Sequence, residues 1–322
     1  MRAHPAFGAL LVGLVLGAVS PAGAQVSHWP LAPDRARELL RTAPFEIRGE
    51  KKTEHGTSGP RRLDLYFPRQ DLSLRAKWKP VPRDGDGINN APRKEVAADR
   101  VQEILLDETN YVAAPTVLRC IPMAALPASI RPARSNVKGA SCVLGTLSLW
   151  IEDVNVPEQL WSPKRFERDP AYAAAMADLN FFTYLVHHRD GRDGNVLVSS
   201  NPDDPRAFAI DNGISFNSRV FNYFVMNWHR VRVPALRGSS IERLRALPPE
   251  QVDSLAIVAE FRLDENGQLV EVPPGANLDP EEGARLQPGV VQMGLTKREL
   301  KKLRERIREL LEDVDSGKIR TF

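Results

Sequence analysis

Two polar loops lie close together in this chain, and only two short apolar runs separate them. The first, "HHRDGRDGNVLV", holds Asp190 and, five residues later, Asn195. The second, "AIDNGISF", places Asp211 at the end of an apolar run and Gly213 where the chain can turn sharply. Asp, Asn and Gly also make up ordinary turns, so each loop alone is a weak signal. Their order and separation favour a site that handles phosphate and a metal ion, with solvated turns as the alternative.

A basic strand and an acidic helix precede these loops. Apolar and basic residues alternate from Leu74 to Val81, as in a half-buried strand, and this places Lys77 and Lys79 on one face. The run "KEVAADRVQEILL" has the apolar spacing of a helix and carries Glu95 near its start. A lysine suits phosphate as a point charge, and a helix glutamate can hold it. Spacing does not choose between the two lysines, and the helix dipole also explains a first-turn glutamate.

These motifs resemble those of kinases. His188-Arg189-Asp190 followed by Asn195 fits H-R-D-x-x-x-x-N, the catalytic loop of protein kinases. The series "WKP … KEVAADRVQEIL … DGRDGNVLV … AIDNGISF" is similar to the atypical kinases of the secretory pathway, of which the Golgi casein kinase is the type. It also resembles the lipid kinases of the phosphatidylinositol 3-/4-kinase type. The resemblance spans Phe45 to Phe216 and lies in the order of the motifs.

The resemblance implies a role for each motif residue. Asp190 would orient the acceptor hydroxyl and accept its proton. Lys79, held by Glu95, would grip the α- and β-phosphates of ATP. Asn195 and Asp211 would hold Mg²⁺ or Mn²⁺. The chain would therefore carry ATP and a divalent cation at one site.

The chain also departs from the families it resembles. The secretory and lipid kinases usually read D-R-H where this chain reads H-R-D-G-R-D, and Asp193 is the alternative base. Lys77 is the alternative phosphate ligand. His187 and His188 as metal ligands lack a third ligand at suitable spacing, so His188 is expected to pack under the loop. No A-P-E motif follows Asp211, so acceptor recognition is not carried over.

Two further segments would contact the nucleotide. No G-x-G-x-x-G loop is present, and "HGTSG", with Gly56 and Gly59, is the candidate cover for the phosphates. By position, the backbone of Ile151, Glu152 and Asp153 would hydrogen-bond the adenine.

The resemblance implies an α+β, two-lobed protein-kinase-like fold, with ATP between the lobes. The β-rich N-lobe would comprise residues 25–154 and the mainly helical C-lobe residues 155–322. Local patterns agree with this division. Thr296, followed three residues later by Glu299, predicts a capping box at the start of the last helix. Helices are predicted at 34–41, 94–106, 170–188, 239–247, 248–261 and 296–314, and strands at 45–52, 61–67, 72–82, 111–126, 141–154, 195–200 and 206–216, with a hairpin at 261–272.

The N-terminus indicates export. Residues 1–24 contain Arg2, an apolar run from Phe7 to Val19 and the small residues Ala22-Gly23-Ala24, as in a signal peptide. The run is short for a membrane span, which needs about 20 residues, although a retained anchor is the alternative. We therefore expect a periplasmic or extracellular protein, or one of the secretory lumen in a eukaryote. No later stretch is predicted to cross a bilayer.

The cysteines and the net charge say less about the function than the motifs do. Cys120 and Cys142 could pair in an exported protein or remain half-buried thiols on neighbouring strands. The net charge of +3 is too mild to indicate a nucleic-acid partner. The last helix is basic and amphipathic, so it could contact anionic lipid, but its leucine face more often marks docking on the domain. Nothing in these patterns indicates an oligomeric state.

Three hypotheses for function follow. The first is an exported ATP-dependent kinase that transfers the γ-phosphate to a hydroxyl of a protein or glycan. The second is a lipid or small-molecule kinase of the phosphatidylinositol 3-/4-kinase type. The third is a pseudokinase binding module, which an export route toward a space poor in ATP would favour. The presence of all the expected ionisable groups argues for an active phosphotransferase.

Overall fold

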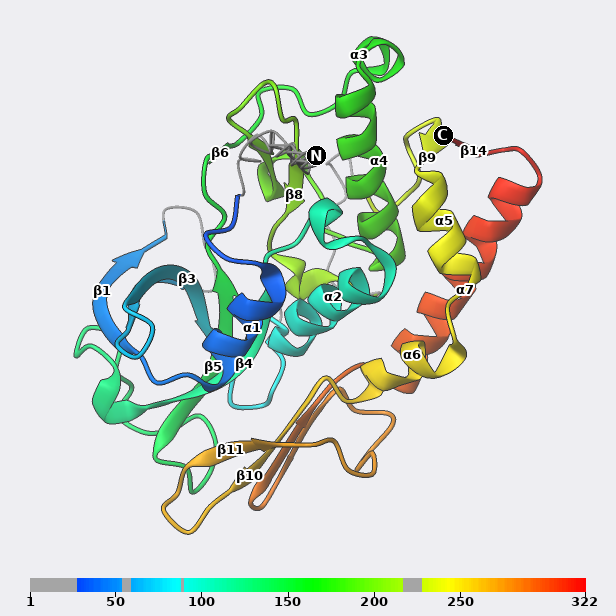
Figure 1. The fold of residues 1–322 in the computed structure, drawn as a ribbon. Helices are drawn as coiled ribbons and strands as arrows, with labels where there is room; N and C mark the ends of the chain where they lie inside the picture. The colour runs from blue at the N-terminus through cyan, green and yellow to red at the C-terminus, as the bar shows by residue number, and fades with distance from the viewer. Residues whose placement is uncertain (1–27, 54–58, 88–89, 217–227) are drawn as a thin grey trace, which may run out of the picture.

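The computed structural model describes residues 28–53, 59–87, 90–216 and 228–322. The predicted signal peptide and Gly56 lie outside the described residues. The chain has a mixed α+β fold, as expected, with seven α-helices in its described part. Figure 1 shows a curled, β-rich region at the left, helices at the right and a second sheet at the bottom.

The first sheet has five antiparallel strands in the order β1-β2-β3-β5-β4. Alternation fixes its faces: Leu63, Leu65 and Phe67 of β2 are buried on one side. On the other side, Arg62 pairs with Lys77, Lys77 with Ser148 and Ser148 with Thr116. The strands are β1 (Glu46–Lys52), β2 (Arg61–Phe67), β3 (Leu72–Pro80), β4 (Thr116–Pro122) and β5 (Cys142–Leu149).

Five of the six predicted helices begin and end close to their predicted positions, and the short helix α3 was not predicted. Prolines stand at the starts of α1, α2, α3, α4 and α6, where a missing N–H costs nothing. Thr296 and Glu299 form the predicted capping box of α7. The helices are α1 (Pro33–Thr42), α2 (Pro92–Leu105), α3 (Pro163–Arg168), α4 (Pro170–Leu185), α5 (Gly238–Arg245), α6 (Pro249–Asp253) and α7 (Lys297–Asp315).

The prediction of one helix over 248–261 is wrong. Helix α6 ends at Asp253, and Ala259–Leu263 forms strand β10 instead. A short apolar run such as "LAIVAEF" suits either element, and pairing with neighbours decides. Here β10 pairs with both β11 and β13 in a second, four-stranded sheet, which makes the second half of the chain less helical than expected. Its other strands are β11 (Leu269–Val272), β12 (Ala284–Gln287) and β13 (Val290–Met293).

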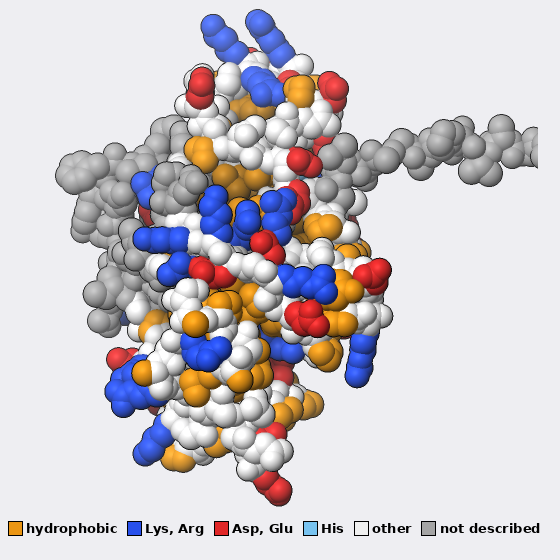
Figure 2. All heavy atoms as spheres, turned by 90° about the vertical axis from the view of Figure 1, so that its left-hand side faces the viewer, with side chains coloured by type: hydrophobic (Ala, Val, Ile, Leu, Met, Phe, Trp, Pro, Cys, Tyr) orange, Lys and Arg blue, Asp and Glu red, His pale blue; other side chains and the backbone are white. Residues whose placement is uncertain are grey.

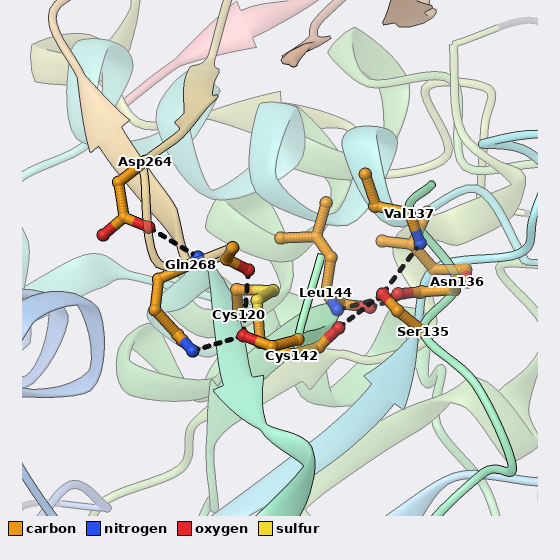
Figure 3. Close-up of a disulfide and its surroundings, with 11 residues drawn as sticks. Cys120, Ser135, Asn136, Val137, Cys142, Leu144, Asp264 and Gln268 are labelled. Carbon is orange, nitrogen blue, oxygen red and sulfur yellow. Dashed lines mark hydrogen bonds between the residues drawn. A yellow bond between two sulfur atoms is a disulfide. The ribbon is translucent and has the colours of Figure 1, made fainter. Parts of the chain in front are cut away.

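The second sheet packs on the first. Phe261 and Met293 share a core with Val96 of α2 and Leu144 of β5. The turn between β10 and β11 reaches Ser141, whose N–H donates to Gly267 O at 2.7 Å. Figure 3 shows Gln268 of this turn beside the disulfide. The remaining short strands are β6 (Val154–Asn155), β7 (Val196–Ser199), β8 (Ala207–Ala209), β9 (Ala235–Leu236) and β14 (Arg320–Thr321).

Two open questions from the sequence are answered by packing. Cys120 and Cys142 form a disulfide between β4 and β5, so neither is a free thiol (Figure 3). Helix α7 buries Leu300, Leu303 and Leu310 against the rest of the chain, which confirms docking of its leucine face. None of the helices in the described ranges is long and apolar enough to span a bilayer.

Candidate active site

A cavity of about 650 Å³ lies beside the polar face of the first sheet. Its wall includes the row of strand partners Arg62, Lys77, Ser148 and Thr116. The opposite side comes from the loops that follow α4 and β8, which bring Asn195 and Asp211 to the same space. Segments far apart in the sequence therefore meet here.

Three predicted residues join at the edge of this cavity. Lys79 Nζ lies 2.7 Å from Glu95 Oε1 and 3.0 Å from Asp211 Oδ1. Lys79 is only 3% exposed. Burial alone would lower the pKa of Lys79, but Glu95 and Asp211 outweigh it and raise the pKa above its ordinary value. The ammonium group is therefore charged and held by two carboxylates.

The two lysines of β3 have different positions. Lys79 is buried with Glu95, whereas Lys77 lines the cavity. Lys77 Nζ also lies 2.5 Å from Asp211 Oδ1. The charge of Lys77 is the main cause that holds the pKa of Asp211 far below its usual range. Spacing alone did not choose between the two lysines, and the structure gives them different roles. Lys79 pairs with the helix glutamate, and Lys77 faces the open space.

The catalytic-loop motif forms a closed hydrogen-bonded turn. Asn195 Nδ2 donates to Asp190 O at 2.8 Å and to Asp190 Oδ2 at 2.7 Å. Ile210 N donates to Asn195 O at 3.0 Å, which ties this turn to the segment leading to Asp211. The side chain of Asp193, the alternative base, lies outside what the structure describes. The loop therefore fixes the carboxylate of Asp190 through Asn195.

His188 packs beneath this loop, as expected. Its ring is fully buried, and Nε2 lies 2.9 Å from Ile210 O. Burial is the main cause that lowers the pKa of His188, so the ring is neutral and donates from Nε2. His188 is thus a support between the loop and the strand that ends at Asp211.

Asp211 has an unusual backbone. Its φ of 59° and ψ of 50° lie in the left-handed region, which costs a non-glycine residue on the order of 1 kcal/mol. The following residues, Asn212–Ile214, form one 3₁₀ turn. A Cβ on Gly213 would lie 3.4 Å from Glu95 Oε1, which is an ordinary van der Waals contact. The backbone strain at this turn is therefore carried by Asp211 itself.

The predicted adenine segment lines the cavity through Ile151, Glu152 and Asp153. Glu152 N already donates to His28 O at 3.0 Å, and its carboxylate pairs with Arg75. A contact with adenine through the Glu152 N–H would have to displace His28. Gly59, described at the edge of the β1–β2 connection, has a φ of 67°.

Sequence reasoning missed the basic mouth of the cavity. Lys51, Lys52, Arg62 and Arg192 line it. Figure 2, which looks at the β1 side of the molecule, shows Lys and Arg side chains gathered across the middle of that face. The hairpin register could have indicated Arg62, because it lies directly opposite Lys77.

Asn195 and Asp211 carry oxygen atoms, the donor type that a hard divalent cation prefers. Asn195 uses its amide nitrogen on Asp190, which leaves the carbonyl oxygen, and both lysines contact Oδ1 of Asp211. Mg²⁺ prefers a few protein oxygens completed by phosphate and water. Within the described ranges, no group of three or more His, Cys, Asp or Glu side chains could hold a metal ion.

No known family model matches the chain, and no curated protein matches it significantly.

Proposed function

We propose that this chain is an ATP-dependent phosphotransferase that acts on a hydroxyl group of a protein or glycan. Its fold would be two-lobed and protein-kinase-like, with ATP in the cavity between a β-rich N-lobe and a C-lobe. The main support is Lys79, which contacts Glu95 and Asp211 beside a cavity that Asn195 also lines. Three separate motifs of the resemblance meet in that one contact.

The charge of the cavity fits a nucleoside triphosphate. Its basic mouth supplies Lys51, Lys52 and Arg62, and Lys77 reaches further in. Such groups attract and orient a polyanion before any chemistry occurs. Lys77 would contact the phosphates, while Lys79 with Glu95 would fix Asp211.

The chain's own residues account for the transfer. Oδ2 of Asp190 is held by Asn195, and Arg192 Nε lies 3.5 Å from Oδ1. The acceptor hydroxyl would meet Oδ1 in place of Arg192. Asp190 accepts the proton as the acceptor oxygen attacks the γ-phosphorus; the bond to the bridging oxygen breaks and ADP leaves. Asn195 and Asp211 would hold Mg²⁺ or Mn²⁺, which would neutralise phosphate charge. The site would act mainly by positioning and charge neutralisation.

Labelled ATP tests this proposal. The full-length chain is incubated with γ-labelled or α-labelled ATP and Mg²⁺ or Mn²⁺ on a panel of peptides, glycans and lipids. We expect the γ-label to move to a peptide or glycan hydroxyl and Asp190→Asn to abolish the transfer. Asp203→Asn, the same change on an exposed residue of the β7–β8 connection, should leave transfer unchanged.

Other outcomes would contradict the proposal. Movement of the α-label would indicate nucleotidyl transfer. Transfer to lipid would replace the acceptor class. Metal-dependent ATP binding without turnover, unaffected by Asp190→Asn, would make the protein a binding module. The predicted signal peptide supports an exported protein, which fits acceptors on secreted proteins or glycans.

A further inference from the structure

The first turn of α2 is charged and yet buried. Arg93 and Lys94 are each 5% exposed, and Glu95 follows them. A basic side chain near a helix N-terminus meets the positive end of the helix dipole, and a buried charge needs a partner. Arg93 and Lys94 therefore require a carboxylate from another element.

Glu299 of α7 supplies that carboxylate to both side chains, and Asp86 Oδ2 is a second partner of Arg93, because it accepts from Arg93 Nε at 2.7 Å. Arg93 Nη1 lies 2.6 Å from Glu299 Oε2, and Arg93 Nη2 lies 3.1 Å from Oε1. Lys94 Nζ lies 3.1 Å from the same Oε1. A two-pronged contact fixes direction as well as distance. Burial alone would raise the pKa of Glu299, but Arg93 outweighs it and holds the pKa below its ordinary value.

Glu299 is itself fixed by the start of its own helix. Thr296 N donates to Glu299 Oε2 at 2.9 Å, and Glu299 N donates to Thr296 Oγ1 at 3.1 Å. The carboxylate also lies where the dipole of α7 favours negative charge. The N-terminal ends of α2 and α7 thus meet through one side chain.

The second sheet fixes the same turn from the side. Gly294 O accepts a hydrogen bond from Arg93 Nη1 at 3.0 Å. A Cβ on Gly283 would overlap the Arg93 guanidinium. Val96, next to Glu95, packs against Phe261 and other residues of this sheet in the second core. Rotation of α2 is therefore restrained by residues that lie far later in the chain.

The restrained turn leads directly to the candidate site. Lys94 Nζ donates to Ser215 O at 3.0 Å, in the turn that follows Asp211. The next residue, Glu95, pairs with Lys79. One helical turn thus connects Glu299 to the ion pair at the cavity.

The geometry points to Glu299 as a positioning residue. By holding Arg93 and Lys94, it sets the rotation of α2 that places Glu95 on Lys79. Its effect on phosphate transfer rests on the proposed function, whereas the positioning of Glu95 can be measured without activity.

The test compares two variants with a matched control. Glu299→Gln removes the charge at the contact, and Gly283→Ala displaces Arg93 without changing any charge. Glu305→Gln is the control, because Glu305 lies on the same helix but pairs with Lys302 of α7 itself, at 2.6 Å. The reactivity of Lys79 toward acetic anhydride is measured by peptide mass, in full-length protein well below its melting temperature.

We expect Lys79 to be acylated about tenfold faster in Glu299→Gln and Gly283→Ala, because loss of one member of a buried charge cluster loosens the rest. Glu305→Gln should match the wild type. With ATP, kcat should fall about tenfold in both variants while the KM for ATP changes little, because Lys77 keeps its place in the cavity.

The outcomes separate the two proposals. Unchanged protection of Lys79 in both variants, or equal loss in Glu305→Gln, would overturn the positioning role whatever the activity. Faster acylation in a protein that transfers no phosphate would support the positioning role and contradict the proposed function. If Glu299→Gln does not fold, Gly283→Ala alone decides.

Discussion

Two of the buried ion pairs on helix α2 are built differently. Near its start, Glu95 pairs with Lys79, which is shared with Asp211 at the cavity. Near its middle, Arg37 of α1 makes two hydrogen bonds to Asp99, at 2.8 and 2.7 Å. The first pair opens onto a cavity, whereas the second is enclosed by protein.

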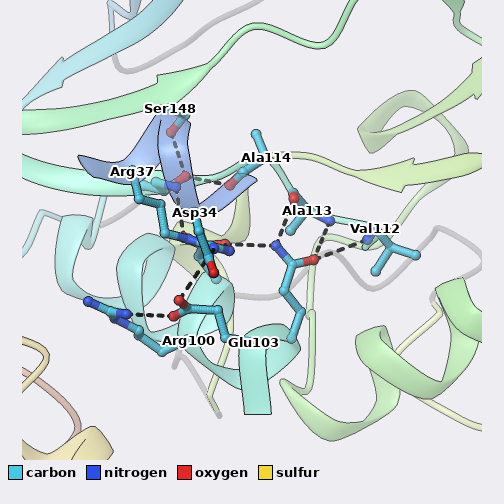
Figure 4. Close-up of polar contacts among 11 residues, drawn as sticks. Asp34, Arg37, Arg100, Glu103, Val112, Ala113, Ala114 and Ser148 are labelled. Carbon is cyan, nitrogen blue, oxygen red and sulfur yellow. Dashed lines mark hydrogen bonds and ion pairs between the residues drawn. The ribbon is translucent and has the colours of Figure 1, made fainter. Parts of the chain in front are cut away.

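The enclosed pair is part of a satisfied network (Figure 4). Asp99 also accepts hydrogen bonds from Thr116 N at 2.8 Å and from Gln102 Nε2 at 2.7 Å. Gln102 in turn accepts from Val112 N at 3.0 Å and Ala113 N at 2.8 Å. This network joins α1 and α2 to the start of β4. Its role is structural.

The open pair has features that the enclosed pair lacks. Lys79 and Lys77 share one oxygen of Asp211, whose side chain is 36% exposed and whose backbone is left-handed. Buried ion pairs by themselves are common structural elements and do not mark a site. A shared, half-exposed carboxylate beside a cavity is the better indicator of function.

An Asp→Asn substitution in each of the two ion-pair networks should separate activity from stability. Asp211→Asn, at the cavity, should have the largest effect. Asp211→Asn removes a charge and tolerates the left-handed backbone. We expect phosphate transfer to fall at least about a thousandfold, or about 4 kcal/mol of transition-state stabilisation. The unfolding free energy should also fall, because Asp211 pairs with both lysines, although Lys79 keeps Glu95 as its partner. Retained transfer would show that Asp211 is not a metal ligand.

Asp99→Asn should have the opposite profile. It removes the carboxylate that makes two hydrogen bonds to buried Arg37, whereas Asp34 and Glu103 remain as its ion-pair partners. We therefore expect a loss of unfolding free energy below the about 3–5 kcal/mol of a fully unpaired buried charge. Denaturant unfolding measures this loss, and the folded fraction should keep its kcat. Asp203→Asn, the same change on an exposed residue outside this network, is the control. A lowered kcat in folded Asp99→Asn would mean that the two clusters are coupled.

The disulfide should stabilise the sheet without affecting the cavity. Cys120 and Cys142 are 22 residues apart, and closing such a loop contributes about 3 kcal/mol in the chain-entropy account. We expect Cys120→Ala/Cys142→Ala to lose about that amount of unfolding free energy. Reductant should lower the melting temperature of the wild type but not that of the double variant. ATP affinity should not change.

Substitutions of the two lysines of β3 should separate ATP binding from the organisation of the site. Lys77→Met should raise the KM for ATP about tenfold, or about 1.4 kcal/mol, with a smaller change in kcat. Lys79→Met should lower kcat more than it raises KM, because Asp211 and Glu95 lose their common partner. Steady-state kinetics measures both. The reverse pattern would assign phosphate contact to Lys79.

The smallest effect concerns pH and the loop before Asp190. Burial is the main cause that lowers the pKa of His187 to about 3, so the folded protein keeps this ring neutral. In the unfolded chain it takes up a proton below pH 6.5, so stability should fall as the pH drops from 6.5 toward 3. Urea midpoints at pH 7.5 and 5 measure the slope. His187→Asn, which suits the φ of 49°, should reduce the slope, and an unchanged slope would contradict this origin.

Local patterns predicted many of the elements. The strand predicted at 61–67 matches β2, and the capping box placed the start of α7. The helix predicted over 248–261 failed because its apolar run gains more from pairing with β11 and β13 than from helix propensity. The same limit hid β12 and β13, which have only four residues each.

The candidate site was predicted in part. Spacing and motif order indicated Lys79, Glu95 and Asp211, which the structure brings together. It did not indicate Arg62 or Arg192 at the cavity mouth. Those side chains reach the cavity through strand register and loop path, which no local pattern encodes.

By itself, the sequence determined the chemistry available to this protein: the carboxylates, the amide and the lysines, each on a strand, helix or loop of predictable type. Only the tertiary structure decided which lysine pairs with Glu95 and which faces the cavity. It also decided that Glu299 holds the helix that carries Glu95. Local periodicity depends on neighbours within a few residues, whereas these pairings depend on side chains that are up to 206 residues apart in the chain.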